Sequence, residues 1–391
     1  MRIVDARARI VLNSRGEPIL EVEINRSSEA VPLGASRGSH EVSRLEIEKA
    51  VEIFNSELVD FLKTYDIQTL GDLKNFEEDF LTIGGIKRYG GDILLAIEYA
   101  ILRAWANYYN KPIYAFFNEK PKFNIKILAN VVGGGAHSKW RGPSVQEFLI
   151  VPYVEDIRLA VFLSSYIHKK IGERLETLDK KFMYGRNDEG AWVTSLDEDS
   201  ILSLLSSIRE EIKKEYSIDI KLGIDMAATH LYKEGVYRYR GKEYSREDFI
   251  SEINRMIKDY KLFYVEDPLF EEDFEGFSEI NKSTDALITG DDLTVTNTER
   301  IKKAIEKNSV KAVIIKPDQV GSLIKVIEAV ELCKRNNIIP VLSHRSGETE
   351  SNILAHLAVG LEIPFVKFGI SGGERISKLN ELIRIFEKIK S

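Results

Sequence analysis

Six ionisable side chains close six short apolar runs in the second half of the sequence. The runs lie at 221–225, 262–266, 286–291, 312–316, 338–344 and 365–367, and they end in Asp225, Glu266, Asp291, Lys316, His344 and Lys367. A single aspartate at such a place is usually a helix cap, and Asp292 is a candidate for that role. Six titratable groups in register are different, because buried charges are costly unless they pair or bind a metal. The pattern therefore predicts a functional site.

Three of these residues, Asp225, Glu266 and Asp291, supply only carboxylate oxygen atoms. Oxygen ligands that leave positions open for water and substrate suit a hard cation such as Mg²⁺. Zinc is disfavoured, because the chain has a single cysteine, Cys333, and neither a His-Glu-x-x-His nor a His-x-His motif. We therefore expect Mg²⁺ as the cofactor.

The other strand-end residues indicate acid–base chemistry beside an anion. In a crowded cationic site the pKa of Lys316 or Lys367 would fall, so that one lysine could act as a general base while the other stabilises a developing anion. Arg345 and Ser346 follow His344 where we expect a helix to begin. A guanidinium, a hydroxyl and a helix N-terminus together form an anion or phosphate site. The alternative is a capping serine beside a surface arginine.

Two more carboxylates lie ahead of this set. Glu147 stands in Gln146-Glu147-Phe148, before a strand-like run, and Glu189 stands in the loop 185–190. If the two are paired, one can hold a proton beside the other and serve as an acid. The alternative is that either one is a surface charge.

The elements that must position these residues alternate between strand and helix. After Glu266 the runs recur every 23 to 28 residues, with helical patterns between them, and this period predicts a β/α barrel whose strand ends share one mouth. The intervening helices are expected at 271–282, 297–308, 321–336 and 347–360, and a hairpin at 231–244. Residues 1–122 predict an N-terminal α+β cap domain, with strands at 2–12 and 19–25 and helices over 44–118. Residues 123–391 are expected to form the C-terminal barrel with the catalytic site.

Composition excludes several classes of protein. Among 391 residues, Lys and Arg number 55 against 62 Asp and Glu, so the net charge of −7 leaves no excess of cations for general nucleic-acid binding. One cysteine cannot form an intramolecular disulfide, and no apolar run is long enough to cross a membrane. We therefore expect a soluble cytoplasmic protein. Lys378, Lys388 and Lys390 are interpreted as a solvated helix face.

Several longer motifs resemble the enolase family (phosphopyruvate hydratase), in an archaeal-like form. They run nearly from end to end: Asn13 to Pro18, Gly34 to Ser36, Gln146 to Phe148, Asn187 to Gly190, Gly290 to Asn297 and Ser343 to Glu350. The resemblance implies an α+β cap on a modified, TIM-like β/α barrel. It also implies a Mg²⁺-dependent lyase of glycolysis and gluconeogenesis that reversibly dehydrates 2-phosphoglycerate to phosphoenolpyruvate, working as a homodimer or larger homo-oligomer.

The resemblance also implies roles. The residues that match Asp225, Glu266 and Asp291 bind the structural Mg²⁺. The match to Lys316 removes the proton beside the substrate carboxylate, and the match to Glu189 donates the proton that lets the C3 hydroxyl leave.

Other implied roles concern assistance and binding. Glu147 assists the acid, and we count His344 with the catalytic residues. The matches to Arg345 and Ser346 hold the phosphate. The matches to Gln146 and Lys367 hold the substrate. The match to Ser36 lies on a closing loop that helps to bind a second Mg²⁺, and the match to His137 lies on another closing loop.

Two alternatives remain open from the sequence. One is a related dehydratase that acts on another carboxylate, although a Lys-x-Lys motif on an early barrel strand is missing and Arg345-Ser346 favours a phosphorylated substrate. The other is a non-catalytic binding protein with the same fold. The segment after Ser36 runs directly into a helical pattern, where the family has a longer acidic stretch.

Overall fold

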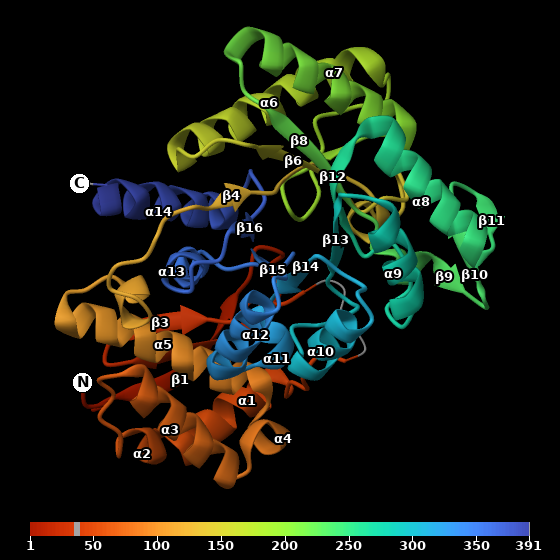
Figure 1. Ribbon diagram of the computed structural model, residues 1–391. Helices are drawn as coiled ribbons and strands as arrows, with labels where there is room; N and C mark the ends of the chain where they lie inside the picture. Colours follow the sequence, from red (N-terminus) through yellow and green to blue (C-terminus); the bar gives the residue numbers. More distant parts are fainter. Residues whose placement is uncertain (35–39, 391) are drawn as a thin grey trace.

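The N-terminal part carries an antiparallel sheet covered by helices. The computed structural model describes residues 1–34 and 40–390 (Figure 1). The sheet has the order β1-β2-β3, formed by Ala6–Leu12, Pro18–Ile24 and Ser27–Ala30. The sequence analysis predicted the first two strands but not β3. Asn25 and Arg26 both have positive φ, 48° and 66°, and this two-residue turn reverses the chain without a glycine.

Five α-helices follow in the described part of the chain, and one of them, α5, is buried over most of its length. They are α1 (Ile47–Ile53), α2 (Val59–Leu62), α3 (Leu70–Thr82), α4 (Gly85–Tyr89) and α5 (Gly91–Tyr109). Helix α5 packs against β2 and β3 on one side and contacts the barrel helix α11 on another. Its apolar residues therefore surround the helix instead of forming one stripe.

The remaining chain forms the predicted barrel. Its sheet has ten strands in the order β4-β16-β15-β14-β13-β12-β8-β6-β5-β7. Their bounds are Lys126–Ile127 (β4), Ala129–Gly133 (β5), Glu147–Pro152 (β6), Trp192–Val193 (β7), Ile220–Asp225 (β8), Leu262–Glu266 (β12), Leu287–Gly290 (β13), Ala312–Ile315 (β14), Ile339–Ser343 (β15) and Phe365–Lys367 (β16). The predicted hairpin is a small separate sheet, β9 (Tyr232–Lys233), β10 (Val236–Tyr239) and β11 (Lys242–Tyr244).

The barrel departs from a purely parallel arrangement at its start. Strand β6 is antiparallel to both β5 and β8, whereas β8 and β12 to β16 are parallel to one another. The run 126–133 closes the barrel, because its β4 half pairs with β16 and its β5 half pairs with β6. The fold is thus the expected modified β/α barrel with an N-terminal α+β part.

Helices surround this sheet (Figure 1). They are α6 (Ile157–Leu178), α7 (Glu198–Tyr216), α8 (Arg246–Tyr260), α9 (Phe274–Ser283), α10 (Thr298–Glu306), α11 (Pro317–Val320), α12 (Leu323–Arg335), α13 (Ile353–Gly360) and α14 (Gly373–Lys390). Side chains such as Leu149, Tyr264, Ile314 and Val341 fill the barrel as a buried apolar layer below the strand ends.

The two parts of the chain pack closely together. A Cβ atom on Gly321, which has φ +63°, would lie 2.4 Å from Cα of Gly91, so α11 and α5 meet backbone to backbone. One continuous buried cluster includes Phe76 of the N-terminal part and Leu323 of the barrel. The domain boundary at residue 122 stays a prediction.

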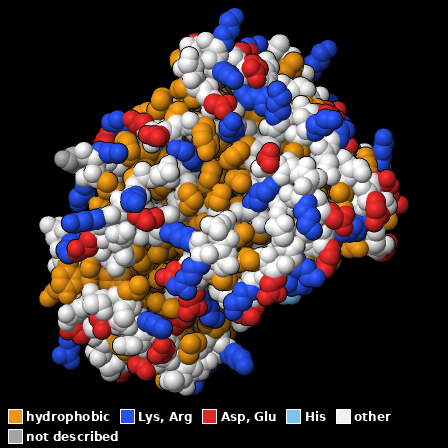
Figure 2. All heavy atoms as spheres, viewed as in Figure 1, with side chains coloured by type: hydrophobic (Ala, Val, Ile, Leu, Met, Phe, Trp, Pro, Cys, Tyr) orange, Lys and Arg blue, Asp and Glu red, His pale blue; other side chains and the backbone are white. Residues whose placement is uncertain are grey.

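The surface carries charges of both signs. Figure 2 shows Lys, Arg, Asp and Glu side chains interspersed over the viewed face. No helix of the described chain combines the length and the apolar character needed to cross a membrane.

Candidate active site

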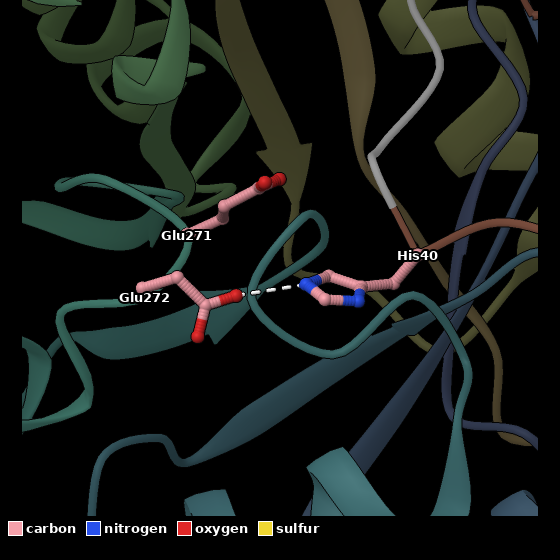
Figure 3. Close-up of side chains that lie close together, drawn as sticks. All are labelled: His40, Glu271 and Glu272. Carbon is pink, nitrogen blue, oxygen red and sulfur yellow. Dashed lines mark hydrogen bonds and ion pairs between the residues drawn. The ribbon is translucent and has the colours of Figure 1, made fainter.

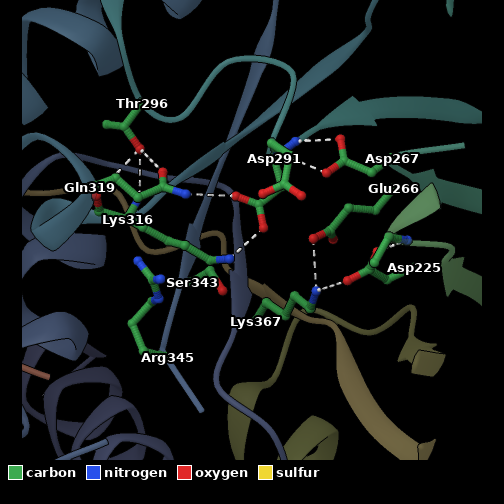
Figure 4. A network of polar contacts seen from close by, with 12 residues as sticks. Asp225, Glu266, Asp267, Asp291, Thr296, Lys316, Gln319, Ser343, Arg345 and Lys367 are labelled. Carbon is green, nitrogen blue, oxygen red and sulfur yellow. Dashed lines mark hydrogen bonds and ion pairs between the residues drawn. The ribbon is translucent and has the colours of Figure 1, made fainter. Parts of the chain in front are cut away.

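The strand ends bring three carboxylates into one buried cluster. In the sheet, Glu266 is paired with Asp225, and Asp225 with Glu147. The side chains of Glu266, Asp225 and Glu147 therefore leave the sheet at the same level. Asp291 follows the end of β13 (Figure 4). Asp225, Glu266 and Asp291 are 3 %, 0 % and 8 % exposed. Without a counter-charge, such a cluster would be strongly unfavourable.

Two lysines supply that counter-charge within the protein. Nζ of Lys367 lies 2.8 Å from Oε1 of Glu266, and 3.1 Å from both Oδ2 of Asp225 and Oε1 of Glu147. The ammonium of Lys316 donates a hydrogen bond to Oδ2 of Asp291. The predicted strand-end residues therefore meet at one mouth.

The pKa of Lys316 differs from the expectation. Burial lowers the pKa of Lys316, but the carboxylate of Asp291 offsets this, and the pKa lies above its ordinary value. Burial likewise lowers the pKa of Lys367, and the charges of Asp225, Glu147 and Glu266 raise it well above the usual range. The prediction of a lowered pKa was wrong for this state of the site, because it considered the neighbouring cations and not the paired carboxylates.

The donor set fits a divalent metal ion. Its atoms are carboxylate oxygens that are shielded from water, which are the ligands preferred by hard cations. Oxygen atoms of Asp267, Asp291 and Asp292 also lie within 4.8 Å of one another. Asp292 does not cap a helix, since Asn297 caps α10. Oε2 of Glu147 is buried and has no hydrogen-bond partner among the described residues.

Glu147 and Glu189 form the second group in the cavity. Ligand atoms of His137, Glu147 and Glu189 lie within 4.8 Å of one another, so these two glutamates are neighbours and not surface charges. Burial and the charge of Glu189 raise the pKa of Glu147 well above its usual range. Of the two glutamates, Glu147 is therefore the one that is more easily protonated.

Two histidines flank Glu189. Its Oε2 lies 3.5 Å from Nε2 of His344 and accepts a hydrogen bond from Nδ2 of Asn130 at 3.0 Å, while Oε1 lies 3.8 Å from Nδ1 of His137. Burial raises the pKa of Glu189, and the histidines more than offset this and lower it. Burial also lowers the pKa of His344 to about 4.

The predicted anion site has a different construction from the one expected. Ser346 does not open a helix, because α13 begins at Ile353. The loop is held instead by Ser14, whose Oγ donates to the carbonyl of Ser346 at 3.2 Å and accepts from the amide of Glu348 at 3.0 Å. The guanidinium and the hydroxyl remain as anion-binding groups, but the helix N-terminus does not.

Arg345 is buried beside two carboxylates. Its Nη1 donates to Oδ2 of Asp318 at 2.7 Å, and its Nη2 donates to Oε1 of Glu41 at 3.0 Å. Arg345 lines the same cavity as Lys316 and Glu189. Gln146 also lines it, and its Nε2 lies 3.4 Å from Oδ2 of Asp225. Ser36 lies outside the described residues.

Sequence reasoning missed two buried cations on α14. Arg375 is 0 % exposed and donates to the carbonyls of Arg345, Ser346 and Asp188 at 2.6 to 2.8 Å. Lys378 is also buried and donates to the carbonyl of Thr349 at 2.9 Å, so its assignment to a solvated face was wrong. Arg375 lies four positions before the buried Leu379, and Lys378 lies four positions before the buried Leu382, and this helical spacing was the available signal.

A third group of polar residues lies close to the cavity. Nε2 of His40 lies 2.8 Å from Oε1 of Glu272, with Glu271 beside it (Figure 3). Arg300 is also in contact, since its Nη1 lies 2.9 Å from the same oxygen of Glu272. This guanidinium supplies the positive charge there, which makes the group a poor cation site.

Comparison with known proteins agrees with this architecture. The family model for the C-terminal TIM barrel domain of enolase matches residues 125–391. The chain is 37 % identical to the enolase of Methanothermobacter thermautotrophicus over 406 residues, which covers 99 % of this chain and 97 % of the relative. It is 37 % identical to the enolase of Pyrobaculum aerophilum (98 % and 96 % covered) and 35 % identical to that of Natronomonas pharaonis (98 % of each). The chain therefore belongs to the enolase family.

Proposed function

We propose that this chain dehydrates 2-phosphoglycerate to phosphoenolpyruvate, and catalyses the reverse reaction, in glycolysis and gluconeogenesis. One observation carries the proposal: a single buried cavity contains a lysine base, a glutamate pair, a carboxylate cluster and an arginine. These are the groups required to remove a proton from carbon, to release a hydroxyl as water and to hold a phosphate ester.

Lys316 is proposed as the base. Its Nζ would take the proton from the carbon beside the substrate carboxylate, the weakest acid in the reaction. Lys316 can do so only once Asp291 has another cation to pair with, because the present ion pair keeps the ammonium charged. A Mg²⁺ ion held by Asp225, Glu266 and Asp291 would supply positive charge where negative charge develops on the substrate.

The glutamate pair is proposed as the acid. Glu189, after receiving a proton from the neighbouring Glu147, would protonate the C3 hydroxyl so that it leaves as water. Asn130 fixes the carboxyl group of Glu189 through a hydrogen bond, and the ring of His344 lies beside it. His137, on the other side of Glu189, closes the cavity there.

The substrate-binding residues are proposed on the same basis. Arg345 and Ser346 would hold the phosphate, and Gln146 and Lys367 would contact the rest of the substrate. Ser36 keeps the role that the family resemblance implies. A homodimer or larger homo-oligomer and a cytoplasmic location follow from the same resemblance, and light scattering coupled to gel filtration would measure the mass of the assembly.

Ultraviolet absorbance of phosphoenolpyruvate tests the proposed reaction. Wild-type protein with 2-phosphoglycerate and Mg²⁺ should produce it, and excess chelator should stop the reaction. Lys316→Ala should lower kcat by at least about a thousandfold, given the size of acid–base contributions together with the loss of a buried partner for Asp291. Lys302→Ala is the matched control, since Lys302 is half-exposed and pairs with Glu299. Folded wild-type protein without turnover at any Mg²⁺ concentration would overturn the proposal.

A further inference from the structure

We propose that Glu41 is an internal competitor of the substrate phosphate: its carboxylate occupies the guanidinium of Arg345 and is displaced when a phosphate-bearing ligand binds. The inference rests on the proposed function insofar as Arg345 is taken as the phosphate-binding residue. It assigns Glu41 a role in specificity, namely selection of a highly charged anion over weaker ones.

The contact between the two residues is close and shielded. Oε1 of Glu41 lies 3.0 Å from Nη2 of Arg345, and each side chain is 3 % exposed. Both residues line the cavity that holds Lys316 and Glu189. Glu41 therefore presents a carboxylate to Arg345 on the side where a substrate must enter.

Arg345 itself has little room to turn away from an incoming ligand. A Cβ atom on Gly34 would lie 1.8 Å from its Nη2, so the guanidinium packs directly on the backbone of Gly34. Nη1 is fixed by Asp318, which also accepts from Nη2 of Arg44 at 2.8 Å. An anion must therefore bind to the guanidinium of Arg345 in its present position.

Of the two carboxylates on Arg345, Glu41 is the one that can leave. Asp318 belongs to helix α11 and is shared between two guanidinium groups. Glu41 belongs to the segment 40–46, which contains neither helix nor strand. Displacement of Glu41 changes a loop, whereas displacement of Asp318 would break two buried ion pairs.

The charges explain why phosphate would win and a weaker anion would not. A buried guanidinium without a counter-ion is costly, so Glu41 stabilises the site while no ligand is bound. A phosphate ester carries up to two negative charges and can accept two parallel hydrogen bonds from arginine, whereas a carboxylate or chloride ion offers one charge. Any anion that binds Arg345 must displace Glu41, and a doubly charged phosphate ester gains more from the guanidinium than a singly charged ion does, so it offsets this cost more readily.

Replacing Glu41 by its neutral isostere tests the competition without catalysis. Inorganic phosphate would be titrated at constant ionic strength and with chelator present, and its dissociation constant would be read from the increase in melting temperature. Glu41→Gln should bind phosphate about tenfold more tightly than the wild type, which corresponds to about 1.4 kcal/mol. Glu41→Ala should shift the affinity in the same direction. Glu46→Gln, an exposed substitution five positions along the chain, should leave it unchanged.

Two results would overturn the inference. Unchanged or weaker phosphate binding in both Glu41 variants would show that Glu41 orients Arg345 instead of competing for it. Tighter binding that persists in the double variant Glu41→Gln, Arg345→Ala would show that the ion binds elsewhere. The titration needs no turnover, so wild-type protein that binds phosphate but does not convert 2-phosphoglycerate would contradict the proposed function and leave this inference standing.

Discussion

Nζ of Lys367 lies 2.8 Å from Oε1 of Glu266, although their strands are not neighbours in the barrel. The side chain of Lys367 extends across the mouth from the end of β16 to the end of β12. Its ammonium group also contacts Asp225 at the end of β8. The charge of the carboxylate cluster is thus partly neutralised from within the protein. A metal ion bound by these carboxylates would act on the same negative charges as this lysine.

Lys367→Met should make the stability of the protein depend on a divalent cation. Removing one partner of a buried ion pair costs about 3–5 kcal/mol, because the remaining charges lose their compensation. Mg²⁺ should restore much of that loss by replacing the lost positive charge, so the rise in melting temperature with Mg²⁺ should be larger in the variant than in the wild type. Calorimetry with Mg²⁺ and with chelator measures both. Lys302→Met is the control, and an equal Mg²⁺ response in variant and wild type would contradict the idea that lysine and metal share these carboxylates.

Arg375→Met should impair the active site, although Arg375 itself does not contact the substrate. Three carbonyl groups of two active-site loops, those of Asp188, Arg345 and Ser346, would lose their donor, and each unsatisfied buried group costs about 1–3 kcal/mol. We expect a loss of stability together with a fall of about tenfold to a hundredfold in kcat/KM, since misplacement of about 1 Å has effects of this order.

Steady-state kinetics and urea unfolding measure these effects on the same samples. Arg384→Met is the matched control, because Arg384 lies on the same helix and is 65 % exposed. Arg375→Lys should recover part of the stability. Normal kcat/KM in Arg375→Met at a temperature where it is fully folded would show that the two loops hold their places without this residue.

The strand-end residues could be predicted from the sequence, because the carboxyl ends of all parallel strands in a β/α barrel meet at one mouth. A residue that ends one of the regularly spaced apolar runs must therefore lie at this mouth, whichever strands pair with one another. The partners of Arg345 follow from no such rule, since Glu41 lies 304 positions away in the chain. The same limit applies to Lys316: its position was predictable, but its pKa depends on the pairing with Asp291.

Local chemistry explains the other differences. The segment 347–352 was expected to open the helix 347–360, yet it is a loop, because Ser14 and Leu33 of the N-terminal part bond its backbone. Its sequence, Gly-Glu-Thr-Glu-Ser-Asn, also has little helix propensity, and the apolar helical pattern starts only at Ile353. Buried Arg375 could have been predicted from its place on the apolar face of α14, had the helical period been given more weight than its charge.

Asp179→Asn should destabilise the protein at neutral pH and much less in acid. Asp179 is buried and accepts hydrogen bonds from Oγ1 of Thr194 and from both the amide and Oγ of Ser195, each at 2.7 Å. Burial raises the pKa of Asp179, but these hydrogen bonds more than offset that and lower the pKa to about 2. A lowered pKa in the folded state gives stability that is complete above the unfolded pKa of about 3.9 and is lost as the pH falls towards 2.

Urea unfolding at pH 7 and at pH 3 measures this difference. The variant should lose about 2.5 kcal/mol at pH 7, which is the free-energy equivalent of the shift in pKa, and clearly less at pH 3. Asp60→Asn removes a carboxylate that is 98 % exposed and serves as the control. A loss of stability that is equal at both pH values would mean that the amide disturbs the packing and that charge is not the cause.

Glu98→Gln should stabilise the protein at higher pH, at the contact between the N-terminal part and the barrel. Oε2 of Glu98, on α5, accepts from the amide of Leu323 at 2.7 Å, and Ser322 contacts Glu77 of α3 at 2.8 Å. Burial and the charge of Glu77 raise the pKa of Glu98 well above its usual range. The folded state thus holds a proton that the unfolded chain releases near pH 4.5, so this carboxyl group lowers stability progressively as the pH rises above that value.

Glutamine keeps the acceptor for Leu323 and adds a permanent donor towards Glu77, which removes this pH dependence. The free energy of unfolding of Glu98→Gln relative to the wild type should therefore increase between pH 5 and pH 8. Chemical unfolding across this range gives the difference directly, and Glu78→Gln, an exposed neighbour of Glu77 on α3, should show no trend. A constant difference between variant and wild type would mean that Glu98 keeps the same protonation state in the folded and unfolded chain, so that Ser322 and Leu323 hold the two parts together without a buried proton.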